Sequence, residues 1–128
     1  MIYLIDTRIF LWWATDISRL SGRILDILGD SNTTILLSTA SIWEIITKNR
    51  TGRLELPEPC AEYIISRMSY YNILPLSITL THMLKLATLP MLHKDPFDRI
   101  LIAQTLAEEA HLVTADAQIA QYDVPFIW

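Results

Sequence analysis

The sequence predicts an α/β fold in which α-helices flank a central, mainly parallel β-sheet. Short, strongly apolar segments alternate with longer amphipathic ones, which is typical of strands connected by helices. The first apolar segment, Met1–Ile5, has no polar face, as in a strand that a parallel sheet buries on both sides. The 128 residues are 52% hydrophobic, which is sufficient for one core. We therefore expect a single domain over residues 1–128.

Five segments are predicted to be strands because they are short, apolar and rich in β-branched residues. Pro75 interrupts the third of them, which indicates an edge strand or a strand terminus because proline cannot donate to a hydrogen-bond ladder. The predicted strands are Met1–Ile5, Ile35–Leu37, Tyr71–Leu76, His111–Thr114 and Val124–Trp128.

Helices are predicted between these strands. Gly29 ends the second of them, and Ser38 and Ser41 offer caps for the helix after the second strand. The predicted helices are Arg8–Ala14, Ser21–Leu28, a helix through Ile42–Ile46 that ends near Arg50, Pro59–Met68, Thr79–Leu86, Pro96 to about Ala110, and a short helical turn at Asp116–Gln121.

The seven residues His93–Arg99 combine two carboxylates with three basic or imidazole side chains. Pro96 suits the first position of a helix, where its missing N–H would be unpaired in any case. Asp95 is then the N-cap and Asp98 lies in the first turn, where the helix dipole stabilises each negative charge by about 0.3–1 kcal/mol. A well-capped helix start explains this segment alone, but the positions of the other acids favour a functional site.

Acidic residues occupy equivalent places along the predicted fold. Asp6 ends the first strand, Asp116 follows the fourth, and Glu44 lies in the helix after the second. The carboxyl ends of parallel strands share one edge of the sheet, where ligands bind. We therefore expect these three acids to meet Asp95 and Asp98 at that edge.

Each acid also has a purely structural explanation. Asp6 fits a turn, Glu44 fits an i,i+4 partner of Lys48, and Asp98 and Asp116 fit first-turn and N-cap positions. The joint pattern is harder to explain in this way. Glu44 lies within the apolar stretch Ile42–Ile46, and burying an unpaired carboxylate is costly.

Four or five gathered acids repel one another, which raises their pKa values unless a cation neutralises them. Oxygen ligands without a cysteine or histidine cluster select Mg²⁺ or Mn²⁺ over Zn²⁺. One or two such ions activate a water for attack on a phosphodiester. His93 can assist, although a lone loop histidine is usually structural or solvated.

The net charge of −4 at first argues against a nucleic-acid substrate. Of the 14 acidic residues, however, five belong to the predicted site, and the other nine face 10 basic residues. An acidic centre with a basic surround suits a metal-dependent enzyme acting on a phosphate polymer, although scattered surface charge explains the count equally well. The basic residues near the motifs are Arg8, Lys48, Arg50, Arg53, Lys94 and Arg99.

No apolar run approaches the roughly 20 residues that span a bilayer, and no basic segment precedes a cleavable apolar stretch. We expect a soluble, cytoplasmic protein without a membrane partner. The single Cys60 excludes an internal disulfide.

The ordered motifs resemble the PIN-domain toxins of the VapC type, which are ribonucleases of type II toxin–antitoxin systems. The motifs are Leu4–Thr7, Leu11–Trp13, Ser41–Ile45, Gly52–Pro57, His93–Arg99, Leu101–Gln104, Leu112–Thr114 and Val124–Trp128. The resemblance implies a PIN fold and a Mg²⁺- or Mn²⁺-dependent endoribonuclease. It also implies a small antitoxin partner that occupies the active site, and a homodimer.

By position, the resemblance implies that Asp6, Glu44, Asp98 and Asp116 form the catalytic, metal-binding quartet, with Asp95 as an accessory acid. We further expect substrate or phosphate positioning by Thr114, Arg8, Lys94 and Arg99. Two residues depart from the family pattern: Arg8 replaces the usual histidine, and Ala115 replaces the usual arginine. Neither change removes a carboxylate.

Other functions remain open. One is a PIN-like binding module with little catalysis, whose aromatic residues Trp12, Trp13, Tyr70 and Tyr71 line an interface. Another is a nuclease acting on DNA, because hydrolysis at a metal site needs no 2′-hydroxyl. An aspartyl phosphatase is disfavoured because Arg8 stands where a second aspartate is needed, and a receiver domain lacks its paired acids and late lysine.

Overall fold

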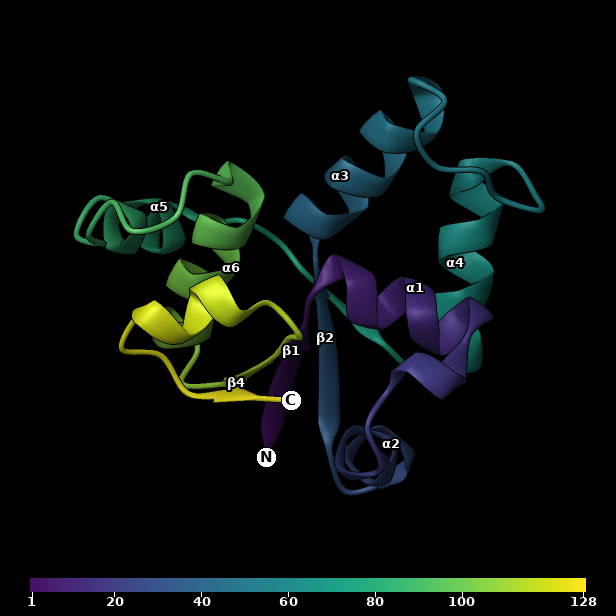
Figure 1. The fold of residues 1–128 in the computed structure, drawn as a ribbon, viewed down its shortest axis with the longest axis horizontal. Helices are drawn as coiled ribbons and strands as arrows, with labels where there is room; N and C mark the ends of the chain where they lie inside the picture. Colours follow the sequence, from purple (N-terminus) through teal and green to yellow (C-terminus); the bar gives the residue numbers. More distant parts are fainter.

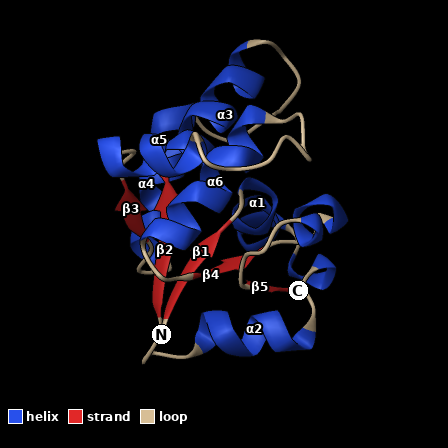
Figure 2. Cartoon of the chain, turned by 90° about the vertical axis from the view of Figure 1, so that its left-hand side faces the viewer, coloured by secondary structure: helices blue, strands red, loops and turns tan.

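The computed structural model describes residues 1–128 and contains a five-stranded sheet in the order β3-β2-β1-β4-β5, in which every strand pair is parallel. The predicted α/β class and parallel sheet are therefore confirmed. Figure 2 shows the strands side by side in this order. The strands are β1 (Ile2–Ile5), β2 (Thr34–Ser38), β3 (Leu74–Leu76), β4 (His111–Val113) and β5 (Phe126–Ile127).

Helices cover both faces of the sheet. Figure 1 shows α1, α2 and α4 on one side and α5 and α6 on the other, with α3 rising beyond the ends of the strands. The helices are α1 (Thr7–Thr15), α2 (Gly22–Gly29), α3 (Thr39–Arg50), α4 (Cys60–Tyr70), α5 (Leu80–Leu86) and α6 (Pro96–Ala107), with 3₁₀ helices η1 (Ile17–Arg19) and η2 (Ala117–Gln121).

Alternate residues of the strands face two separate cores, which is why the strands are apolar throughout. Ile5 and Val113 pack with α1, α2 and α4. Leu4 and Leu112 pack against α6 and the segment after β4. The two tryptophans of α1 differ in burial. Trp13 is buried against Tyr71, with ring centroids 4.2 Å apart, while Trp12 is only partly buried.

Several predicted boundaries were too generous. The helix expected to reach Ala110 ends at Ala107, because Glu109 adopts φ 53° and the N–H of Ala110 returns to the carbonyl of Thr105. Without a glycine, this end carries no sequence signal. The last strand is Phe126–Ile127 only, and Leu74–Leu76 is the edge strand that Pro75 indicated.

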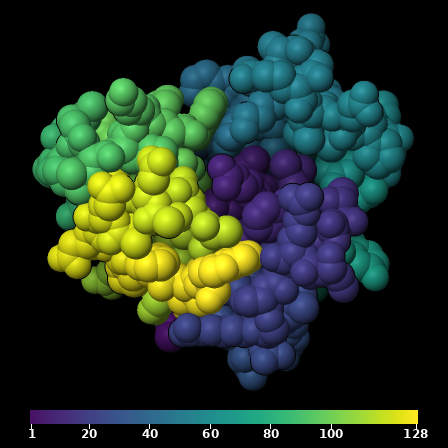
Figure 3. Space-filling model, in the orientation of Figure 1, coloured from purple at the N-terminus to yellow at the C-terminus, as the bar shows by residue number.

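The register of the sheet brings polar residues to one edge. Ile5 of β1 pairs with Leu37 of β2 and with Val113 of β4. The next residues along these strands, including Asp6 and Thr114, therefore lie together where the three central strands end. In Figure 3 the N-terminal segment lies between α3 and the green and yellow parts of the chain. None of the helices is both long and apolar enough to cross a membrane.

Candidate active site

A small polar cavity of about 60 Å³ lies at the carboxyl ends of β1 and β4. All five predicted acids line it, together with three other polar residues. Its lining consists of Asp6, Thr7, Arg8, Glu44, Lys48, Asp95, Asp98 and Asp116. Residues from four separate segments of the chain thus meet at one place.

Asp6 is the most enclosed carboxylate of this cavity, with 5% of its surface exposed. It caps α1: its Oδ1 accepts from the N–H of Ile9 at 2.8 Å. Its Oδ2 accepts from the hydroxyl of Thr114 at 2.6 Å. Burial raises the pKa of Asp6 to about 6, although both hydrogen bonds oppose the rise. Asp6 therefore serves as a helix cap. Burial favours its neutral form, and a nearby cation would favour its ionised form.

Glu44 is buried, as predicted, but it is not unpaired. The hydroxyl of Thr7 donates to its Oε1 at 2.6 Å, and Lys48 Nζ lies 2.6 Å from its Oε2. The i,i+4 pairing that the sequence left open is therefore real, and the argument from an unpaired buried carboxylate was wrong. Neighbouring Trp43 is largely exposed, so the helix is less buried than its sequence indicates.

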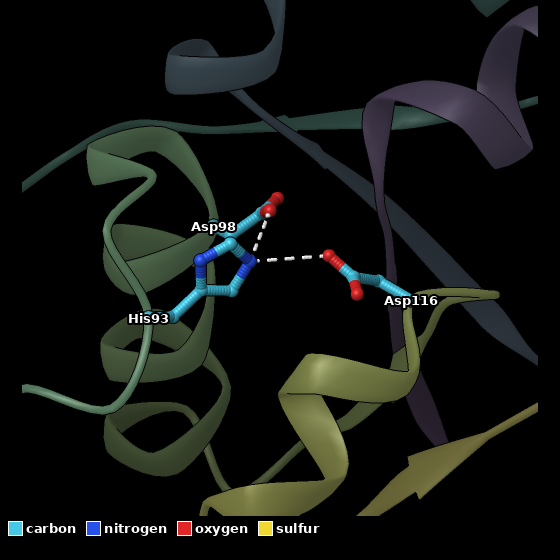
Figure 4. A group of neighbouring side chains, drawn as sticks. All are labelled: His93, Asp98 and Asp116. Atoms are coloured by element: carbon cyan, nitrogen blue, oxygen red, sulfur yellow. Dashed lines mark hydrogen bonds and ion pairs between the residues drawn. The ribbon is translucent and has the colours of Figure 1, made fainter.

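Asp98 and Asp116 are joined by His93, as Figure 4 shows. The Nε2 of His93 lies 3.0 Å from Oδ2 of Asp98 and 3.1 Å from Oδ2 of Asp116. The backbone N–H of Asp95 donates to Nδ1 of the same ring at 3.2 Å, so the proton that faces the two carboxylates is on Nε2. The ring is 10% exposed and therefore largely shielded from water.

The two carboxylates that His93 joins differ in acidity. Burial, together with the charges of Asp95, Asp116 and Asp6, raises the pKa of Asp98 to about 7, while His93 opposes the rise. Burial also acts to raise the pKa of Asp116, but hydrogen bonds from the N–H of Gln118 and from His93 outweigh it and lower that pKa. One member of the pair therefore holds a proton more readily than the other near neutral pH.

The segment before α6 is fixed by contacts within the fold. The hydroxyl of Tyr122 accepts from the N–H groups of Leu92 and His93, at 3.1 and 2.9 Å. Asp95 caps α6 as predicted, accepting from the N–H of Phe97 at 2.9 Å. These bonds hold the imidazole of His93 against the start of α6.

The three basic residues predicted to position substrate or phosphate differ in where they lie. Arg8 lines the cavity, is exposed, and takes part in no ion pair of the structure. Lys94 is exposed but lies outside the cavity lining, and Arg99 donates from Nη2 to the carbonyl of Leu89 at 3.4 Å instead of facing the acids. Of the three, Arg8 alone borders the acidic cavity.

Sequence reasoning missed Thr7, which carried no signal beyond its position next to Asp6. It left two roles open for His93: assistance in the chemistry, or the structural or solvated role usual for a lone loop histidine. The signal available for His93 was its place at the start of the seven-residue motif. Its contact with Asp116, 23 residues away, depends on how η2 returns toward α6.

The residues present fit a divalent metal ion. A ring nitrogen of His93 and carboxylate oxygens of Asp98 and Asp116 all lie within 4.8 Å of one another, and further carboxylates border the same cavity. Burial raises the pKa values of Asp6 and Asp98, and a bound cation would favour the charged forms of both carboxylates. Carboxylate oxygens suit Mg²⁺ and Mn²⁺.

Comparisons with known proteins agree with this architecture. Ribonuclease VapC16 from Mycobacterium tuberculosis is 45% identical over 56 residues, a match that covers 44% of this chain and 40% of that protein. The matched part thus spans well under half the length of this curated relative.

Solved structures show the same fold over nearly the whole chain. VapBC2 from Rickettsia felis, bound to a DNA fragment from its promoter, gives a TM-score of 0.78 at 18% identity and covers 100% of this chain and 99% of that one. VapBC-1 from nontypeable Haemophilus influenzae gives 0.70 at 16% identity, covering 99% and 97%. FitAcB from Neisseria gonorrhoeae gives 0.59 at 19% identity, covering 100% and 97%.

The family is decided by a match to a whole-domain model. The model of the PIN domain matches residues 3–125, from the first strand to the residues just before the last strand. The chain belongs to the PIN domain family.

Proposed function

We propose that this protein is a metal-dependent endoribonuclease of the VapC type, which hydrolyses RNA phosphodiester bonds. The observation that carries the proposal is the cavity of about 60 Å³ in which five carboxylates meet. The relative named Ribonuclease VapC16 supports RNA as the substrate.

Within this proposal, Asp6, Glu44, Asp98 and Asp116 hold Mg²⁺ or Mn²⁺, with Asp95 as an accessory acid. A bound ion of this kind would activate a water and stabilise charge on the phosphate oxygens. Thr114 keeps Oδ2 of Asp6 in place through its hydroxyl. Arg8, which has no acidic partner within ion-pair distance, contacts a substrate phosphate at the rim.

His93 is a positioning residue in this account. Ligating carboxylates are commonly oriented by hydrogen bonds from a neighbouring group, and such neighbours matter for metal affinity. The Nε2–H of His93 reaches one oxygen of each of two carboxylates and fixes their separation.

We further propose a small antitoxin as the partner and a homodimer as the oligomeric state. Support for the partner comes from related solved structures, which include a toxin–antitoxin complex from Klebsiella pneumoniae. An apolar groove of about 220 Å³ next to the site is suited to apolar side chains of such a partner. It is lined by Ala40, Trp43, Ile78, Met83, Leu86, Pro96, Phe97 and Ile100.

The test of the proposed activity is cleavage of a structured RNA, with a DNA of matching sequence alongside. Purified protein free of antitoxin is incubated with Mg²⁺ or Mn²⁺, with EDTA in a parallel reaction. The Asp98→Asn protein, purified in the same way, controls for contaminating nuclease. We expect RNA cleavage that needs the metal and is lost in the variant. Cleavage of DNA alone would reassign the substrate, and a folded protein that cleaves neither would support a binding module.

A further inference from the structure

A second polar cavity, of about 340 Å³, adjoins the acidic one. The two share Glu44, Lys48 and Asp95 as lining residues. The second cavity has two cations on its walls, Lys48 and Arg53, and an aromatic ring, Phe97. Its chemistry therefore differs from that of the acidic cavity, which five carboxylates surround.

The end of α3 places Arg53 beside Lys48. Gly52 adopts φ 77°, and its N–H donates to the carbonyl of Asn49 at 3.2 Å. The N–H of Arg53 donates to the carbonyl of Lys48 at 2.9 Å. This pair of bonds around a left-handed residue folds the chain back over the last helical turn. The Nε of Arg53 then donates to the hydroxyl of Thr51 at 3.1 Å, which restrains the guanidinium.

The charge of Arg53 is not paired with a carboxylate within the fold. Arg53 is exposed and belongs to none of the ion pairs. Lys48 is bonded to Glu44, yet 43% of its side chain stays exposed, so further donors of its ammonium group are free to bind. Two cations held at the mouth of an acidic site provide a place for an anionic group that must lie near that site.

The aromatic wall adds a second feature of nucleic-acid binding. Phe97 is partly buried and makes an edge contact with Trp43, at 5.2 Å between ring centroids and an interplanar angle of 77°. Cations that follow a phosphate backbone, combined with a ring on which a base stacks, are typical of sites for single-stranded nucleic acid. Bases of single strands are free to leave the helical stack and bind in this way.

We propose that this second cavity is a subsite for the nucleotide next to the scissile phosphate of a single-stranded RNA. Arg53 and Lys48 bind the flanking phosphate, and the base lies against Phe97. This inference rests on the proposed nuclease function and adds the direction in which the strand leaves the acidic site, along the end of α3.

The test measures binding of a short, fluorescently labelled single-stranded RNA by anisotropy, in the Asp98→Asn background so that the RNA stays intact. Arg53→Gln is compared with Arg23→Gln, which removes an arginine of α2 that is likewise exposed and belongs to no ion pair. Loss of one phosphate contact to a single strand lowers the slope of log K against log salt by about 0.7, which is about fivefold in affinity at 0.1 M salt. We expect this change for Arg53→Gln and none for Arg23→Gln.

Phe97→Leu tests the stacking separately, because it keeps an apolar side chain and changes no charge. We expect at least roughly fivefold weaker binding with an unchanged salt slope. Thermal unfolding of each variant shows whether the fold is intact, and Mn²⁺ binding by the corresponding single variants that keep Asp98 shows whether the acidic site is intact.

Failure of this inference is distinguishable from failure of the proposed function. If the wild-type protein cleaves RNA but Arg53→Gln and Arg23→Gln bind it equally well, the subsite is overturned and the nuclease function stands. If Arg53→Gln weakens binding of an acidic peptide and leaves RNA binding unchanged, the cavity belongs to a protein partner and the subsite is likewise overturned. A wild-type protein that neither binds nor cleaves RNA removes both proposals.

Discussion

The two halves of the acidic site are built differently. In the strand half, which consists of Asp6, Thr7, Glu44 and Thr114, each carboxylate has its own threonine hydroxyl at 2.6 Å. In the histidine half, which consists of His93, Asp98 and Asp116, one imidazole serves both carboxylates at 3.0 and 3.1 Å. The strand half is therefore organised by neighbours along the sheet edge, and the histidine half by one side chain from an irregular segment.

This difference affects how each half responds to change. Asp6 lies where β1 passes into α1, and its N–H is itself bound to the carbonyl of Val113 of β4. Its position is thus set by the sheet. Asp98 and Asp116 are held together by the ring of His93, so one substitution outside the carboxylates is enough to separate them.

The largest effect is expected from removing one carboxylate from either half. Asp6→Asn and Asp98→Asn each delete a charge that the proposed ion needs, and the ion supplies several kcal/mol of transition-state stabilisation, so RNA cleavage should fall by roughly 10³-fold or more. Initial rates at saturating Mn²⁺ measure it, with Asp26→Asn, at an exposed position of α2, as the control. Wild-type rates in Asp6→Asn alone would show that the strand half is only a helix cap.

The next largest effect concerns His93. His93→Ala should weaken Mn²⁺ binding by about 10- to 100-fold, as loss of a group that orients metal ligands commonly does. His93→Gln keeps an N–H donor and should recover part of the loss. Mn²⁺ titration followed by electron paramagnetic resonance measures it without reference to activity, and His111→Gln, on β4, is the matched control. Tighter binding in His93→Ala would mean that the imidazole competes with the ion.

The same difference explains how far the sequence predicts the site. Asp6, Asp116 and the capped start of α6 were predictable because they follow local rules: a strand end, and an N-cap before proline. The cavity that these residues share follows from the parallel sheet, since the register places Asp6 next to Thr114. The positions of Asp6 and Thr114 are thus a consequence of patterns that the sequence displays.

The histidine half was not predictable in the same way. The contact of His93 depends on the hydroxyl of Tyr122, 29 residues further along, which fixes the backbone before α6. Of the two partners of Glu44, Lys48 was predictable from helical spacing, but Thr7, 37 residues away in the sequence, was not. Contacts between irregular segments are set by tertiary packing, on which local patterns carry no information.

A smaller effect is expected on stability as a function of pH. In the metal-free protein the pKa values of Asp6 and Asp98 are raised to about 6 and about 7, from 3.8. The folded chain therefore binds protons at these two groups more readily than the unfolded one, so their contribution to stability is fully present below about pH 4 and is lost as the pH rises to about 7. Asp116, whose pKa is lowered, acts only below this window.

Thermal unfolding of metal-free protein between pH 4.5 and 7.5 measures this loss. For Asp6 the pKa shift corresponds to a stability loss on the order of 1–3 kcal/mol, which Asp6→Asn should remove. The dependence of stability on pH should become flatter below about pH 6 in Asp6→Asn, and up to about pH 7 in Asp98→Asn. Added Mn²⁺ should flatten the wild-type profile, and a profile equally steep with and without the metal would contradict binding at these carboxylates.

The two threonines offer a finer comparison within the strand half. Thr114→Val and Thr7→Val each remove a hydroxyl from a buried carboxylate, at a cost of about 1–3 kcal/mol. We expect the larger loss for Thr114→Val, because Glu44 keeps Lys48 as a partner and Asp6 has no ion pair. Urea unfolding at pH 7 measures both, with the Thr→Ser variants restoring the hydroxyl. Equal losses would mean that Lys48 adds nothing to Glu44.

The smallest effect is expected from Arg8, which lines the acidic cavity next to the strand half. Arg8 lies next to Asp6 in sequence and lowers its pKa slightly, but it forms no ion pair. Arg8→His and Arg8→Gln should therefore change the free energy of unfolding by less than about 0.5 kcal/mol, as for other exposed side chains. RNA affinity should fall in Arg8→Gln with a shallower salt dependence, because a phosphate contact is lost. If the Arg8 variants instead unfold much more easily than the wild-type protein, Arg8 balances the buried charge of Asp6. The strand half would then depend on a cation, just as the histidine half depends on its imidazole.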